Sequence, residues 1–174
     1  MPDTKPSASL ALVSGESHYH NPILFADCPD PDAIRVGNRF FLVCSTFSHE
    51  PGLTLLESDD LVHWRFAGHA LPRLTPAKFF NQPRRGCRVW APALRHHDGR
   101  FWIFHPDPDH GIYMVNATDF AGPWSEPVLV LAGRGLIDPC PLWDDDGRAY
   151  LVHAGRSAGS CTCSRCAGAR TAGR

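Results

Sequence analysis

The chain has 174 residues, which is enough for one ordinary domain with a single hydrophobic core. Hydrophobic residues make up 43% of it and charged residues 20%, so its composition is that of a globular protein. The formal net charge of −1 provides no field that would attract nucleic acid or an anionic membrane, and we expect neither partner.

The first 20 residues, "MPDTKPSASLALVSGESHYH", contain a short apolar run without the basic segment and long apolar core of a secretory signal. We predict that residues 1–20 are a disordered leader and that the protein is cytoplasmic. No window reaches the roughly 18 consecutive apolar residues that a membrane-spanning helix needs.

The seven cysteines are odd in number, and four of them are scattered through strand-like or apolar stretches: Cys28, Cys44, Cys87 and Cys140. This pattern favours buried free thiols over a disulfide framework, which again indicates a reducing compartment.

Short apolar segments bounded by turn residues dominate the rest of the chain, and helical periodicity is nearly absent. With 16 prolines and 15 glycines, long helices are excluded and an all-β protein is expected. The segments rich in β-branched and aromatic residues predict strands at 40–47, 53–58, 101–105, 111–117, 127–132 and 149–154.

A repeat becomes visible when the turns are aligned. The segments "RVGNRFFLV", "RHHDGRFWIF" and "WDDDGRAYLV" each place a Gly-containing turn before an Arg and an apolar strand, with the arginines 61 and 48 residues apart. A second element, "ESDDLVHW" and "NATDFAGPW", follows the first two units and ends in Trp. Repeats of this size built only from strands predict a β-propeller, of which the chain holds two complete blades and the start of a third.

Aspartates precede the first strands of the first and third units. Asp27, Asp30 and Asp32 lie in "ADCPDPDAIRVG", and Asp138 lies in "LIDPCPLWDDDG". Each Asp-Pro pair is also a common turn former, so turn chemistry is an alternative for every one of them. Because the innermost strands of a propeller converge on its axis, Asp30 and Asp138 are candidates for one shared site. Two carboxylates at such a site are what glycosidic hydrolysis requires, one as a base and one as an acid.

The sequence resembles the N-terminal part of glycoside hydrolase family 43 over about residues 21–154. The resemblance rests on four segments in order: "PDPDAIRVGNRFFLVCSTFSHEPGLTLLESDDLVHW", "RVWAPALRHHDGRFWIF", "GIYMVNATDFAGPW" and "GLIDPCPLWDDDGRAYLVHA". It implies a partial five-bladed β-propeller and an inverting β-xylosidase or α-L-arabinofuranosidase that acts on xylo- or arabino-oligosaccharides from plants.

The resemblance also implies roles for four residues. Asp30 matches the general base, and Asp138 matches the aspartate that orients the base and tunes the pKa of the acid. Phe47 and Trp90 resemble apolar residues that line sugar subsites, where a ring stacks on the sugar face. The alternative for both aromatic residues is ordinary core packing.

The third carboxylate of the family, a general acid Glu, has no counterpart after Asp138. The four glutamates all precede that position: Glu16, Glu50, Glu57 and Glu126. We therefore expect the chain as given to be inactive. A non-catalytic carbohydrate-binding or vestigial propeller fragment is the alternative function.

Residues 155–174 contain mainly Gly, Arg, Ser, Ala, Cys and Thr and differ sharply from the patterned sequence before them. We expect the folded domain to cover residues 21–154 and this tail to be disordered, as a frameshifted or prematurely ended reading frame would be. Neither "CTCSRC" in the tail nor "HPDPDH" at 105–110 is expected to bind a metal, and no cofactor is expected. The oligomeric state is left open.

Overall fold

A computed structural model describes residues 18–82, 85–155 and 161–165 of the chain. This part consists of antiparallel sheets, with one helix of four residues, α1 (Ala77–Phe80). The prediction of an all-β protein is confirmed. No helix among the described residues is long and apolar enough to cross a membrane.

The first sheet has four strands in sequence order, so each strand pairs with the next one along the chain. Its strands are β1 (Asp32–Val36), β2 (Arg39–Cys44), β3 (Gly52–Ser58) and β4 (Trp64–Leu71). The β1–β2 turn is the two-residue Gly37-Asn38 connection, where Gly37 takes a left-handed φ of 62°. Such turns favour glycine because it lacks a Cβ.

The second sheet repeats this topology after the short helix. Its strands are β5 (Ala93–His97), β6 (Arg100–Asp107), β7 (Gly111–Ala117) and β8 (Val128–Ala132). The predicted strands in both sheets are confirmed within a few residues. The strands β1, β4 and β5 were not among the predicted segments, because their sequences are more polar or are interrupted by Gly.

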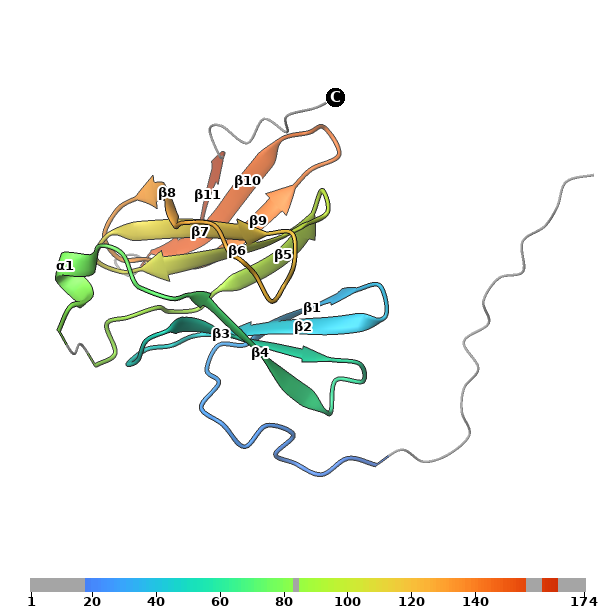
Figure 1. The fold of residues 1–174 in the computed structure, drawn as a ribbon. Coiled ribbons are helices and arrows are strands. Elements are labelled where there is room, and N and C mark those ends of the chain that lie inside the picture. The colour runs from blue at the N-terminus through green and yellow to red at the C-terminus, as the bar shows by residue number, and fades with distance from the viewer. Residues whose placement is uncertain (1–17, 83–84, 156–160, 166–174) are drawn as a thin grey trace, which may run out of the picture.

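The third sheet contains β9 (Leu136–Trp143), β10 (Ala149–Gly155) and β11 (Cys161–Arg165) in the order β11-β10-β9. The expectation of a tail disordered from residue 155 is wrong for residues 161–165, which pair antiparallel with β10. Backbone hydrogen bonds to an open strand edge depend little on side-chain type, and a Cys-Thr-Cys sequence suits a strand. Figure 1 shows this third sheet beside the second one.

The first two sheets enclose the main core. Side chains from both meet in an aromatic cluster, where the ring centroid of Phe41 lies 4.9 Å from that of Phe101 and 4.8 Å from that of Phe120. Leu151 of the third sheet packs instead with Phe104 and Ile112 of the second. The three sheets are therefore joined by hydrophobic contacts in chain order.

The Trp-ending repeat has the same local structure in both sheets. Backbone amides following Asp60 and Asp119 donate to their carboxylates, and the indoles of Trp64 and Trp124 donate to carbonyls three or four residues earlier. These bonds close the connection before the outer strand. Hydrogen bonds from His63 and from nearby backbone amides hold the pKa of Asp60 well below its usual range.

The expectation of four buried free thiols is wrong. Cys28 and Cys44 form a disulfide, while Cys87 and Cys140 are exposed free cysteines. Spacing in the sequence did not indicate the pair, because the pairing of β1 with β2 is what brings the segment before β1 alongside the end of β2.

Candidate active site

The first-sheet aspartate, Asp30, lies just before β1 in a left-handed backbone conformation, with φ of 48°. Aspartate tolerates this region better than most residues because its short side chain bonds locally. The side chain is exposed, and its Oδ2 accepts a hydrogen bond of 2.8 Å from Ser45 Oγ. Ser45 N–H also donates to Pro29 O at 2.9 Å, so the segment is fastened to the end of β2.

The third-sheet aspartate, Asp138, has the same backbone conformation, with φ of 52°, and is also exposed. Its position in the sheet is equivalent, because Asp32 pairs with Val43 in the first sheet as Cys140 pairs with Val152 in the third. The aspartate-proline repeat of the sequence is thus a repeat in the backbone.

A chain of polar contacts links the innermost strands of all three sheets. The Oδ2 atom of Asp32 accepts hydrogen bonds from Leu94 N–H at 2.7 Å and from Arg95 Nη1 at 2.9 Å. On its other side, Arg95 Nη2 lies 3.2 Å from Cys140 Sγ. Asp30 lies two residues before Asp32, and Asp138 lies two residues before Cys140, so both aspartates adjoin this network of contacts. That they share one site stays a prediction.

The two aromatic candidates, Phe47 and Trp90, are brought together by the structure. Their ring centroids lie 6.0 Å apart in an edge-to-face arrangement, and both side chains are half-buried. They meet because an isolated bridge joins Thr46 to Val89 and because Arg88 N–H donates to Phe47 O at 3.2 Å. The indole of Trp90 donates to Gly86 O at 2.9 Å, which fixes its ring.

Two glutamates before Asp138 are engaged in ion pairs. Glu50 Oε1 lies 3.1 Å from Arg88 Nη1 and accepts the Leu74 N–H at the same distance. Glu57 pairs with Arg39 and lies 3.6 Å from Arg65. Both carboxylates therefore belong to the structure of the first sheet and its connection to the second.

A buried histidine, His105, lies in β6. His105 is 6% exposed, its ring stacks on Tyr113, and neither ring nitrogen has a hydrogen-bond partner among the described residues. Burial alone lowers the pKa of His105 to about 3, so the ring is neutral at physiological pH. With Arg88 and Tyr113 it lines a small cavity between the first two sheets.

The segment "HPDPDH" forms a turn. Asp107 accepts backbone N–H groups of Asp109 and His110, and the His110 ring nitrogen lies 3.0 Å from its second oxygen. The described residues contain no group of three or more His, Cys, Asp or Glu side chains that would hold a metal ion. The side chains of "CTCSRC" lie outside the described residues.

Ser45 and Arg95 are parts of the candidate site that the sequence patterns did not predict. The sequence repeat aligns Ser45, just after β2, with Ala154 in β10, but one hydroxyl in one copy of the repeat is too weak a pattern to mark a site residue. The partner of Arg95 lies 63 residues away, a separation that no local pattern reveals.

The chain is an all-β protein built from repeated antiparallel sheets. Its candidate site contains the aspartates near the start of two inner strands. The sequence profile of glycosyl hydrolases family 43 matches residues 19–168, beyond the domain end expected at 154. The chain belongs to this family.

Relatives and solved structures agree with the family. The chain is 40% identical over 151 residues to a putative β-xylosidase of Xylanibacter ruminicola, covering 83% of this chain and 27% of the relative. It is 41% identical to a non-reducing end α-L-arabinofuranosidase of Bacteroides ovatus, covering 82% and 27%.

Among solved structures, the chain resembles the xyloglucan-locus GH43B protein of Bacteroides ovatus, with a TM-score of 0.71 at 38% identity over 84% of this chain and 29% of that one. It also resembles a xylan β-1,4-xylosidase of Bacillus halodurans, with a TM-score of 0.71 at 30% identity over 87% and 31%. The chain thus spans about 27% of the length of the curated relatives named above.

Proposed function

We propose that the described chain is the N-terminal part of an inverting glycoside hydrolase that removes terminal xylose or arabinofuranose from plant oligosaccharides. The three sheets are then blades of a five-bladed propeller that is incomplete in this chain. The names of the relatives support this substrate class. The observation that carries the proposal is the equivalent placement of Asp30 and Asp138 at linked inner strands.

In this proposal, Asp30 is the general base that takes a proton from the attacking water. Its exposed carboxylate keeps one oxygen, Oδ1, outside the bond with Ser45, so that oxygen is the one available to the water. Asp138 orients the base and tunes the acid, and inversion requires the base and the acid to lie roughly 6.5–9.5 Å apart with water between base and sugar. Phe47 and Trp90 provide an apolar wall for the sugar ring.

In this proposal the general acid is missing from the chain, because none of its four glutamates follows Asp138. Two of them, Glu50 and Glu57, are also held in ion pairs at the first sheet. General acid catalysis typically contributes about 10²- to 10⁴-fold, so natural oligosaccharides should not be hydrolysed measurably. An aryl glycoside needs little protonation of its leaving group and is the substrate on which residual activity would appear.

The test compares Asp30→Asn with Asp98→Asn in the 174-residue chain, using 4-nitrophenyl β-xyloside and α-L-arabinofuranoside. Asp98 is a matched control because it is an exposed aspartate with a left-handed φ of 49°, located in the β5–β6 turn. We expect slow release of nitrophenol that Asp30→Asn abolishes and Asp98→Asn preserves.

Three outcomes would overturn parts of this proposal. Hydrolysis of xylo-oligosaccharide by the chain would show that another group supplies the proton. Equal aryl-glycoside turnover in the two variants would remove Asp30 from the base role. Binding of xylose without any turnover, weakened by Trp90→Ala, would favour the non-catalytic carbohydrate-binding alternative.

A further inference from the structure

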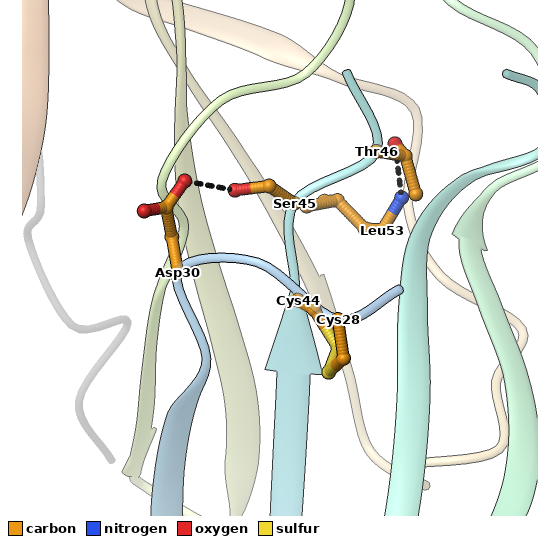
Figure 2. The surroundings of a disulfide bond; sticks show 6 residues. All are labelled: Cys28, Asp30, Cys44, Ser45, Thr46 and Leu53. Carbon is orange, nitrogen blue, oxygen red and sulfur yellow. Dashed lines mark hydrogen bonds between the residues drawn. A yellow bond between two sulfur atoms is a disulfide. The ribbon is translucent and has the colours of Figure 1, made fainter. Parts of the chain in front are cut away.

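The Cys28–Cys44 disulfide lies directly beside the candidate base. Its Cα atoms are 5.3 Å apart, and Cys28 precedes Asp30 by two residues while Cys44 is the last residue of β2 (Figure 2). Cys44 is fully buried and packs with Leu42 and Leu56, so one end of the disulfide is embedded in the core of the first sheet. The disulfide therefore connects the segment before β1 to a rigid part of the molecule.

Ser45 provides a second attachment next to the disulfide. It is 2% exposed, and its hydroxyl and its backbone N–H both reach across to the segment that contains Asp30. In Figure 2 the Asp30 carboxylate points toward the Ser45 hydroxyl just beyond the end of β2, next to Cys44 of the disulfide. The buried position of Ser45 leaves its hydroxyl few other orientations.

The segment needs these attachments because it lies outside the sheet. The paired residues of β1 begin at Asp32, and Asp30 itself is exposed in a left-handed conformation. The left-handed conformation costs a non-glycine residue free energy, and it persists only where surrounding contacts compensate for that cost. The attachments at residues 28, 29 and 30 are the disulfide, the Pro29 carbonyl and the Asp30 carboxylate.

We propose that Cys28, Cys44 and Ser45 are positioning residues for Asp30. The disulfide fixes the segment that contains Asp30 only while the protein is oxidised, and reduction releases it. The role of Asp30 as base rests on the proposed function, whereas the fixing of the segment does not. The bond forms by exchange with a disulfide-bearing oxidant, which becomes a dithiol by accepting the two thiol protons and two electrons.

The disulfide also bears on the compartment in which the protein works. The cytoplasmic expectation relied on free thiols, a premise that is wrong for Cys28 and Cys44. Lasting disulfides are typical of oxidising compartments. The positioning of Asp30 would then be complete only where such an oxidant is present.

The first experiment is hydrogen exchange measured by mass spectrometry on the purified chain, after non-reducing peptide mapping has shown which cysteines are linked. A phosphine reduces the bond by taking up oxygen from water, which leaves a phosphine oxide and two thiols. We compare oxidised chain, phosphine-treated chain and the Cys28→Ala/Cys44→Ala variant, with Cys87→Ala as control because Cys87 is an exposed free thiol.

We expect peptides spanning residues 28–32 and the Ser45 amide to exchange about tenfold faster without the disulfide, while β6 and β7 keep their protection. The Cys87→Ala control should match the oxidised chain. Unchanged exchange at residues 28–32 after reduction, or a map in which Cys28 and Cys44 are not linked, would refute the proposal.

The second experiment tests Ser45 separately from overall stability. Ser45→Ala should move the ¹³C resonance of the Asp30 carboxyl carbon and quicken exchange at 28–32, and Ser45→Thr, which retains the hydroxyl, should restore both. A shift that Ser45→Thr does not restore would assign Ser45 a packing role only. If Asp30→Asn leaves aryl-glycoside turnover unchanged, the proposed function fails while these exchange results still decide whether the segment is held.

Discussion

Asp30 and Asp138 occupy equivalent positions in the first and third sheets, yet their surroundings differ. Near Asp30, the end of β2 supplies Cys44, which forms the disulfide with Cys28, and Ser45 next to it donates a hydrogen bond to Asp30. Around Asp138 the same two positions are His153 and Ala154, and the Asp138 carboxylate has no hydrogen bond or ion pair within the described residues. The backbone repeat sets where a carboxylate lies, and the neighbouring side chains decide how firmly it is held.

The second sheet has neither an aspartate nor a serine at the positions that correspond to Asp30 and Ser45. Its inner strand begins after Ala91-Pro92, so no carboxylate is present, and His105 stands where the other sheets have Cys44 and His153. The three sheets thus share one backbone plan with three different sets of side chains.

The largest effect in this comparison is expected from the disulfide. Its cysteines are separated by 16 residues, and closing a loop of this size stabilises a protein by about 3 kcal/mol. We expect Cys28→Ala/Cys44→Ala to lower the free energy of unfolding by that amount in urea denaturation. Cys87→Ala should leave it unchanged, and an equal loss in both variants would show that the disulfide is not the cause.

The next effect concerns pH and the buried histidine of the second sheet. The unfolded chain takes up a proton at His105 below a pKa near 6.5, whereas the folded chain does so only near 3. The unfolded state therefore binds more protons between these values, and stability falls as the pH is lowered. From pH 7 to pH 5 the loss from this residue is about 2 kcal/mol.

His105→Phe should remove that part of the pH dependence, because phenylalanine does not titrate and has a similar shape. Denaturation curves of the variant and the parent at pH 7 and pH 5 measure the difference. A variant that loses as much stability as the parent on acidification would show that other groups carry the pH dependence.

The smallest effect is expected from giving the third sheet the hydroxyl that the first sheet has. Ala154→Ser places a hydroxyl where Ser45 stands in the first sheet, opposite Ile137, the counterpart of Pro29. A new bond to Asp138 should stabilise the chain by about 1 kcal/mol and slow hydrogen exchange near residue 138. Ala132→Ser, at an exposed position of β8, is the control. No slowing near residue 138 would mean that the two positions differ more than their strand registers indicate.

Most of the strands and the family were predictable from the sequence. Alternating apolar residues, Asp-Gly turns and the spacing of Arg39, Arg100 and Arg148 act over a few residues, so their consequences appear in any local window. The Asp-Pro pairs at Asp30 and Asp138 were visible for the same reason. That both aspartates meet at one catalytic centre stays a prediction.

Only the tertiary structure decided the contacts that support those residues. Strand register placed Cys28 against Cys44, an isolated bridge brought Phe47 to Trp90, and inner-strand packing joined Asp32 to Arg95. The open edge of β10 gave residues 161–165 a strand partner. The physical reason is that pairing and packing depend on which segments lie side by side in space, and residues far apart in the chain carry no local mark of it.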